Sequence, residues 1–280
     1  MLTDSADDLR QRAGAPLELV AVAVRDTAKP RPGIDPALLT DDPMSVVTRD
    51  DVDIVVEVMG GLDPTRELLE TALANGASVI SANKALLSEH SASLHQIAHD
   101  HGVDLFYEAA VAGAIPLLRP LRESLAGDRV SRVLGIVNGT TNYILTKMDE
   151  EGADYADVLA EAQRLGYAEA DPTADVGGHD AAAKAAILAT LAFHSSVTLS
   201  DVYCEGITSV TLRDVEAARD LGYVIKLLAV AERTADGHGV VTRVHPALVP
   251  RAHPLASVRD AFNAVFVEAE SAGQMMFYGR

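Results

Sequence analysis

Two lysines carry most of the chemistry that this sequence could perform, and Lys184 stands in the clearer setting. It lies in the run from Ala181 to Phe193, which is otherwise almost wholly apolar. A helix that is apolar on every side is normally buried, and a buried lysine is costly unless a carboxylate partners it. Asp180 precedes Lys184 by one helical turn and lies on the same helical face. This spacing favours a paired ammonium group inside a core.

Three carboxylates crowd the loop before this helix, namely Glu169, Asp171 and Asp175. A solvated acidic loop is one alternative to a polar site. An exposed ion pair between Asp180 and Lys184, worth about 0.3–0.5 kcal/mol, is another. Carboxylates beside a buried lysine would instead suit a substrate with a cationic amine. Oxygen ligands could also hold a metal ion, although no histidine pattern supports a transition metal.

The other lysine, Lys84, follows an apolar strand expected at residues 78–82, in the segment Ser81-Ala82-Asn83-Lys84. Roughly the first 110 residues alternate such strands with helices. Further strands are expected at 17–25, 53–59 and 103–109, and helices from Pro64, capped by Asp63, to about Gly76 and from about Ser88 to Gly102. Short apolar strands alternating with helices predict a parallel sheet covered on both faces.

The pattern changes after residue 115, and the second half indicates an α+β arrangement with a mixed sheet. Helices are expected at about 116–127, 141–150, 154–165 and 180–194, and strands at 130–137, 224–232, 239–246 and 263–269, the last opening a hairpin. Asn138-Gly-Thr-Thr-Asn142 lies between a strand and a helix. Backbone N–H groups and hydroxyls there could hold a carboxylate or phosphate, or could cap the helix.

Composition narrows the class of protein. The net charge of −18 argues against nucleic acid and anionic membranes as partners. A single cysteine, Cys204, excludes an internal disulfide and fits a reducing cytoplasm. The polar start gives no sign of a signal peptide, and no apolar run reaches the roughly 20 residues that span a bilayer. We therefore expect a cytoplasmic protein.

The parallel domain lacks one expected feature. A nucleotide-binding domain of this kind begins with a strand, a glycine-rich turn and a helix that holds the pyrophosphate. Nothing matches G-x-G-x-x-G ahead of the strand at 17–25, and residues 4–13 look like the end of a helix. The predicted fold is α/β: an incomplete Rossmann-like parallel-sheet domain, followed by an α+β domain.

Four segments together resemble the homoserine dehydrogenase family: SANKALL (81–87), EAAVAGAIP (108–116), VNGTTNYILTKM (137–148) and GYAEADPTADVGGHDAAAK (166–184). The resemblance implies NAD(P)-dependent interconversion of L-homoserine and L-aspartate 4-semialdehyde, a step towards threonine and methionine. It also implies an NAD(P)-binding domain over 1–115 and a catalytic and dimerisation domain over 116–280. A homodimer or larger homo-oligomer is expected.

The resemblance also implies roles for residues of the site. Lys184 would donate or accept a proton, and Asp180 would set its position and charge. Lys84 would lie between the nicotinamide cofactor and the substrate. Glu169 and Asp175 would bind the substrate amino group.

Further residues would bind the cofactor and a monovalent cation such as sodium. Besides Lys84, the cofactor-binding residues would be Ser81, Gly60, Gly61 and Arg25. The cation site would consist of Glu108, Val111, Gly113 and Ile115, largely through backbone carbonyls. Arg25 ends a strand where a 2′-phosphate could lie, which favours NADP, although Asp26 follows and keeps NAD as the alternative.

The implied reaction needs a group that exchanges a proton with the substrate oxygen, and a lysine can do this. Hydride leaves C4 of the alcohol as the hydroxyl proton departs, so a base within hydrogen-bonding reach is required. Burial would lower the pKa of Lys184, whereas Asp180 would raise it. A protonated Lys184 suits the reducing direction, because it can donate to the nascent alkoxide. An aldehyde dehydrogenase would instead need a cysteine nucleophile, and Cys204 stands in no matching motif.

Compared with the family pattern, the sequence is expected to lack the first strand, the glycine-rich turn and half of the first helix. At the other end, it is expected to lack a closing glycine-rich turn and helix. Loss of a central strand would leave two neighbouring strands with free edges. The alternative to an active enzyme is therefore an inactive, truncated remnant that cannot bind dinucleotide and at most dimerises.

Overall fold

The computed structural model describes residue 2 and residues 4–280, which form two compact units that interleave along the chain. The first unit comprises residues up to Glu57 together with Asp63–Ile80 and Leu94–Leu105. The second comprises Val58–Leu62, Ser81–Ser93 and Phe106–Arg280. No helix in the described part of the chain is both long and apolar enough to cross a membrane.

The first unit contains two small sheets. Strands β1 (Val22–Ala23) and β2 (Leu39–Thr40) pair in parallel. Helix α1 (Ala6–Ala13) precedes them, and helix α2 (Pro43–Val47) follows, capped by the Asp42 carboxylate. The strand expected over 17–25 is thus only two residues long, because only Val22 and Ala23 have strand partners.

The other sheet has the order β3-β4-β5 and alternates with helices in the expected way. It is built from β3 (Ile54–Glu57), α3 (Thr65–Ala74), β4 (Ser78–Ser81), α4 (Lys84–His101) and β5 (Leu105–Phe106). The predicted parallel-sheet domain is confirmed. Two boundaries were wrong: Pro64 itself occupies the cap position of α3, and α4 begins four residues before Ser88.

One face of the β3-β4-β5 sheet is open to solvent, so the prediction that both faces are covered is wrong. Ile54 and Val56 alternate along β3 and are 48% and 62% exposed, and Ile80 on β4 is 41% exposed. Their neighbours Glu57, Val79 and Leu105 are buried. Exposed β-branched residues on an edge strand favour pairing with another chain.

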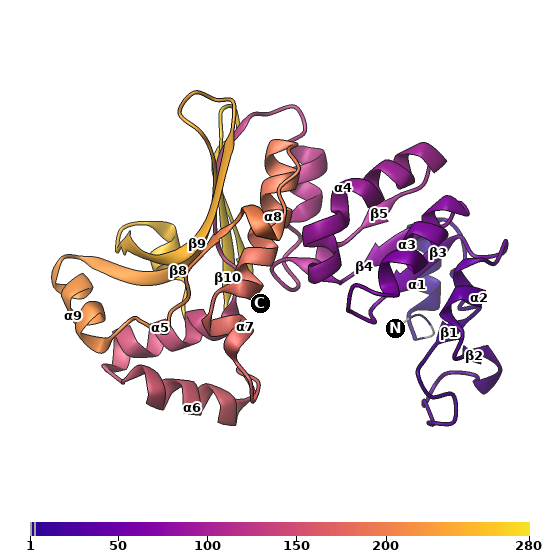
Figure 1. The fold of residues 1–280 in the computed structure, drawn as a ribbon, viewed down its shortest axis with the longest axis horizontal. Coiled ribbons are helices and arrows are strands. Elements are labelled where there is room, and N and C mark those ends of the chain that lie inside the picture. Colours follow the sequence, from indigo (N-terminus) through magenta and orange to yellow (C-terminus); the bar gives the residue numbers. More distant parts are fainter. Residues whose placement is uncertain (1, 3) are drawn as a thin grey trace. The chain divides into compact units, whose positions relative to one another are not determined.

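The second unit is built on a six-stranded sheet in the order β11-β10-β6-β8-β9-β7, and the sheet is mixed, as predicted. Figure 1 labels its strands β8, β9 and β10. Its strands are β6 (Val130–Ile136), β7 (Tyr203–Cys204), β8 (Tyr223–Arg233), β9 (Val240–Pro250), β10 (Asn263–Ala269) and β11 (Gly273–Gly279). All pairs are antiparallel except β7 with β9. The expected hairpin is β10-β11.

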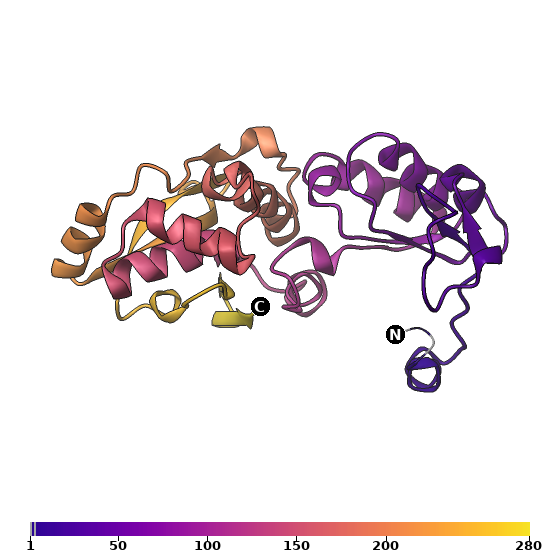
Figure 2. The ribbon, with the colours of Figure 1, turned by 90° about the horizontal axis from the view of Figure 1, so that it is seen from below.

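Five helices accompany this sheet: α5 (Gly139–Glu151), α6 (Tyr155–Leu165), α7 (Thr173–Val176), α8 (His179–Phe193) and α9 (Leu212–Asp220). Helix α8 packs against β6, β8 and β9, and its many buried alanines allow a close approach. Helices α5 and α6 lie side by side in both views (Figures 1 and 2). The helix expected at 116–127 is reduced to a π-helical turn over Pro120–Ser124, and α9 was not predicted.

A buried lysine that the sequence did not reveal joins the sheet to α5. Lys226, on β8, is 1% exposed and donates to Asn142 Oδ1 at 2.9 Å and to Val258 O at 2.6 Å. Burial lowers its pKa to about 8, although Asp149 and Glu150 oppose the shift. Asn142 Nδ2 in turn donates to the carbonyls of Val258, Asp260 and Phe262. These bonds hold the 258–262 loop against α5.

Candidate active site

Helix α8 places Lys184 inside the second unit. Its Nζ donates to Asp180 Oδ2 and to the carbonyl oxygen of Val137, both at 2.6 Å. The Lys184 and Asp180 side chains are 13% and 12% exposed. The expected buried pair is therefore present, and the alternative of a solvent-exposed ion pair is wrong.

Lys84 reaches the same carboxylate from the start of α4. Its Nζ donates to Asp180 Oδ1 at 2.5 Å, and its side chain is 42% exposed. Asn83 fixes this start: its Oδ1 accepts from Leu86 N, and its Nδ2 donates to Gly61 O at 2.7 Å. Asp180 thus lies between two ammonium groups contributed by α4 and α8.

The end of β6 closes the site. Asn138, 5% exposed, donates from Nδ2 to Asp175 Oδ1 at 2.7 Å and to Asp180 Oδ2 at 3.0 Å. The sequence indicated the Asn138–Asn142 segment but not this bridge, and a polar residue directly after a buried strand was the available signal. The hydroxyl of Thr140 donates to Tyr167 O, so its hydrogen is already used in a bond within the protein.

The charges of the buried pair influence each other strongly. Burial opposes ionisation of Asp180. The Lys184 charge and the hydrogen bonds from Lys184, Lys84 and Asn138 outweigh it and lower the Asp180 pKa to about 2. Burial also lowers the pKa of Lys184, and Asp180 opposes that shift. The site therefore holds an ionised carboxylate beside an amine whose proton is easier to remove than that of a surface lysine.

The acidic loop divides into three different environments. Asp175 lies on α7 and joins the network through Asn138. Asp171 accepts from N and Oγ1 of Thr173, the first residue of α7, so its carboxylate is occupied by a local turn. The Glu169 side chain is exposed and makes no hydrogen bond or ion pair within the described residues. Of the two predicted substrate-binding carboxylates, Asp175 alone is joined to the site by a hydrogen bond.

The segment predicted to bind a cation turns sharply. Ala112 and Gly113 both have positive φ, 60° and 61°, and Arg280 O accepts from Ala114 N at 2.9 Å. Val111 and Ile115 are buried, and their carbonyl oxygens accept no hydrogen bond within the described residues. Unpaired buried carbonyls are costly without a polar partner.

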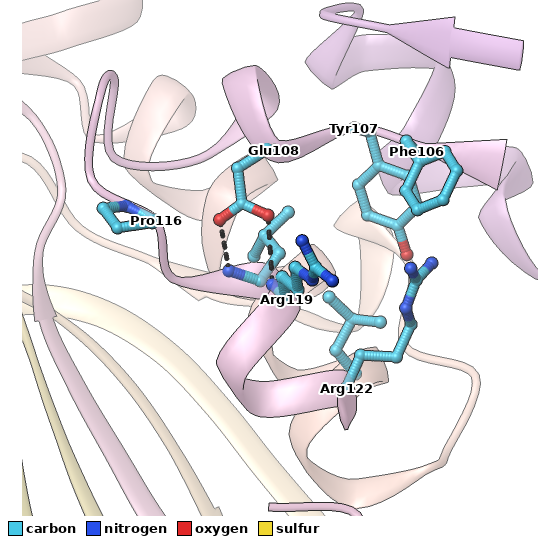
Figure 3. Close-up of a pocket in the computed structure, with 8 residues that line it drawn as sticks. Phe106, Tyr107, Glu108, Pro116, Arg119 and Arg122 are labelled. Carbon is cyan, nitrogen blue, oxygen red and sulfur yellow. Dashed lines mark hydrogen bonds between the residues drawn. The ribbon is translucent and has the colours of Figure 1, made fainter. Parts of the chain in front are cut away.

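Glu108 stands beside a cavity of about 270 Å³ (Figure 3). Its two carboxylate oxygens accept from Leu118 N at 2.7 Å and Arg119 N at 3.0 Å. The lining is mostly apolar and consists of Phe106, Tyr107, Glu108, Pro116, Leu118, Arg119, Arg122 and Leu191. It includes neither lysine of the site. In the described chain, no three His, Cys, Asp or Glu side chains gather as metal ligands.

The predicted cofactor-binding residues fall in both units. Gly60 and Gly61 follow β3 and adopt positive φ values of 75° and 77°. The Ser81 hydroxyl oxygen accepts from Asn83 N, and the side chain is buried. Arg25 lies two residues after β1, in the first unit, and is exposed. Gly61 and Ser81 are therefore linked to Lys84 through Asn83.

Cys204 has no activated thiolate. Its Sγ donates to Gly177 O at 3.4 Å and lies 4.0 Å from Nδ1 of His179. Burial raises the pKa of this thiol. The structure gives no support to a cysteine nucleophile, which an aldehyde-oxidising enzyme would need.

Comparison with known proteins decides the family. The family described as "Homoserine dehydrogenase, NAD binding domain" matches residues 2–108, and the family described as "Homoserine dehydrogenase" matches residues 116–280. The homoserine dehydrogenase of Corynebacterium glutamicum is 58% identical over all of this chain. The chain belongs to the homoserine dehydrogenase family. It spans 63% of the length of that relative.

Solved homoserine dehydrogenase structures agree with the fold. The enzyme of Thiobacillus denitrificans superposes with a TM-score of 0.91 at 44% identity, covering 99% of this chain and 64% of that one. A hyperthermophilic archaeal homoserine dehydrogenase in complex with NADPH has a TM-score of 0.72 at 28% identity, covering 85% of this chain and 68% of that one.

Proposed function

We propose that this chain carries the catalytic centre of an NAD(P)-dependent homoserine dehydrogenase that interconverts L-homoserine and L-aspartate 4-semialdehyde in threonine and methionine biosynthesis. The observation that carries the proposal is the pair of ammonium groups, Lys84 and Lys184, on the two oxygens of Asp180. A chain of this family that holds a half-exposed and a buried lysine on one carboxylate is suited to proton transfer at an alcohol or aldehyde oxygen.

Lys184 is the proton donor and acceptor in this proposal. In the reducing direction its ammonium donates to the oxygen of the aldehyde as that oxygen becomes an alcohol. In the oxidising direction the neutral amine, favoured by burial, removes the hydroxyl proton. Asp180 stays ionised and stabilises the ammonium form of Lys184. The Val137 carbonyl accepts a hydrogen bond from Lys184 Nζ and so orients this amine.

The amino group of the substrate needs an anionic partner near this oxygen. Asp175 is half-buried and lies one amide group away from Asp180, which supports its role as that partner. Glu169 is proposed as the second partner on the resemblance alone. Its exposed carboxylate makes no bond within the described residues and would be free to turn towards a bound amine.

The cofactor is a nicotinamide dinucleotide, which supplies or accepts the hydride when bound. The match to the family's NAD-binding domain supports this. We propose NADP, because an archaeal relative binds NADPH and Arg25 follows β1 as an exposed cation, with NAD as the alternative. Sodium or another monovalent cation would be held by Glu108, Val111, Gly113 and Ile115, as the unpaired carbonyls favour.

A homodimer formed through the six-stranded sheet is proposed for the assembly. Strand β11 ends the sheet, and two of its apolar side chains, Met276 and Tyr278, are 38% and 52% exposed. Analytical ultracentrifugation tests this assembly. The single cysteine supports a reducing compartment such as the cytoplasm.

The test of the function is homoserine-dependent reduction of NADP⁺, followed by the absorbance of NADPH, with Lys184→Ala as the inactive control. The first unit contains two separate sheets, and this favours a second candidate function. In that candidate, the chain by itself binds dinucleotide only weakly. Fluorescence titration of the 280-residue chain with NADPH distinguishes the two, because tight binding rules out the second candidate.

A further inference from the structure

Asn138 connects the two acidic residues of the site through one atom. Its Nδ2 carries two hydrogens and lies 2.7 Å from Asp175 Oδ1 and 3.0 Å from Asp180 Oδ2. Two carboxylates held this close to one nitrogen repel each other, and each would be displaced without a shared donor. The amide is neutral, so it joins them without adding to the charge of the site.

The orientation of the amide is fixed from the opposite side. Asn138 Oδ1 accepts from Thr141 N at 2.9 Å and from Thr141 Oγ1 at 3.0 Å. A backbone N–H can only donate, so the oxygen of Asn138 must face Thr141 and the nitrogen must face the carboxylates. All hydrogens of the amide nitrogen and two acceptor positions of the oxygen are then occupied.

Asn138 also stands next to the group that directs Lys184. The carbonyl of Val137 accepts from Lys184 Nζ at 2.6 Å, so two successive residues at the end of β6 contact both members of the buried pair. A displacement of this strand end would move the ammonium and the carboxylate together.

We propose that Asn138 is a positioning residue, whose amide nitrogen holds Asp175 and Asp180 at a fixed separation and keeps their roles distinct. Asp180 thereby remains with Lys184, and Asp175 remains directed at the cationic amine of the substrate. This role of Asn138 rests on the proposed function. Asn138 would act through Asp175 and Asp180 and itself needs no contact with the reacting atoms.

The competing explanation is a helix cap. Asn138 is the N-cap of α5, and this role uses its oxygen alone. Serine and aspartate cap helices about as well as asparagine. Asn138→Ser therefore keeps a cap but is too short to bridge the carboxylates. Asn138→Asp keeps both the cap and the length but replaces the donor with a third negative charge.

The experiment compares both variants with the wild type and with Thr141→Val, which removes one bond to the Asn138 oxygen and leaves its nitrogen in place. The readouts are kcat, KM for homoserine, the pH profile of kcat/KM and the thermal midpoint. Both Asn138 variants are expected to lose about 100-fold in kcat/KM. Asn138→Ser should keep a nearly unchanged midpoint, whereas the third buried carboxylate of Asn138→Asp should lower it. Asn138→Asp should also move the acidic limb of the profile to higher pH. Thr141→Val should lose far less.

Carbon-13 NMR titration of the Asp180 carboxyl group gives a readout without turnover. In Asn138→Asp and Asn138→Ser its pKa is expected to rise above the wild-type value, because a donor to the charged form is lost. If the wild type does not turn over homoserine but this shift is seen, the proposed function fails and the positioning role stands. If both variants keep kcat/KM and the Asp180 pKa within error of wild type, Asn138 merely caps α5 and the proposal is overturned.

Discussion

Lys84 and Lys184 share one carboxylate, although they lie on different helices and 100 residues apart in the chain. Lys84 takes Oδ1 of Asp180 and Lys184 takes Oδ2, at 2.5 and 2.6 Å. The two lysines differ in exposure, 42% against 13% for their side chains. Lys84 is therefore open to a ligand, whereas Lys184 is shielded and its proton affinity is set by the protein.

Lys184→Ala should remove turnover with little loss of stability. The variant lacks the proposed proton donor, and general acid–base catalysis contributes about 10²–10⁴-fold, so kcat should fall by that factor. Asp180 keeps its bonds to Lys84 and Asn138, which limits the cost of the lost partner. Steady-state kinetics and thermal unfolding measure the two effects.

Lys147→Ala is the matched control, because Lys147 also pairs with a carboxylate one helical turn away, Glu151, at 2.6 Å. This pair lies on the surface of α5 and outside the site. Its loss should leave kcat within about twofold and change stability little, because an exposed ion pair is screened by solvent. Near-normal turnover of Lys184→Ala would contradict the assigned role.

Asp180→Asn should change the response of stability to acid. The folded-state pKa of Asp180, about 2, lies below its ordinary value of 3.8. The carboxylate therefore stabilises the fold above about pH 4, and this contribution disappears as the pH falls towards 2. The difference corresponds to about 2 kcal/mol. Urea unfolding of both proteins between pH 2 and 6 checks it: the gap should be wide at pH 6 and close at pH 2.

Lys226→Met should remove a stability change at alkaline pH. The folded-state pKa of Lys226, about 8, lies below its ordinary value of 10.5, so between these values the unfolded chain binds more protons than the folded one. The free energy of unfolding of the wild type should therefore rise through this window by about 3 kcal/mol from this group. The difference between wild type and variant isolates it. A difference that stays constant from pH 7 to 10.5 would show that Lys226 titrates normally.

Val56→Lys should reduce self-association of the chain. Val56 is 62% exposed on the open face of the β3-β4-β5 sheet, where a charge opposes pairing with another strand. Leu221→Lys is the control, because Leu221 is 70% exposed but follows α9 instead of lying in a sheet. Light scattering over a range of concentrations should show less aggregation for Val56→Lys alone. Equal behaviour of both variants would mean that this face does not associate.

The sequence by itself determined the features that depend on neighbours within a few residues. The Asp180–Lys184 pair follows from helical periodicity, and the strand over residues 263–269 follows from its apolar β-branched run. The alternation of strands and helices predicted the parallel sheet. The four segments that resemble the family contain most of the residues of the site.

The tertiary structure decided which distant groups meet. The approach of Lys84 to Asp180, the bridge from Asn138 and the burial of Lys226 join segments separated by 96, 42 and 84 residues. It also joined Asp175 to the site through Asn138 while leaving the Glu169 side chain exposed, although the two are close in sequence. Local patterns fix periodicity and exposure, but the packing of α8 on the sheet and the start of α4 set which side chains reach a shared carboxylate.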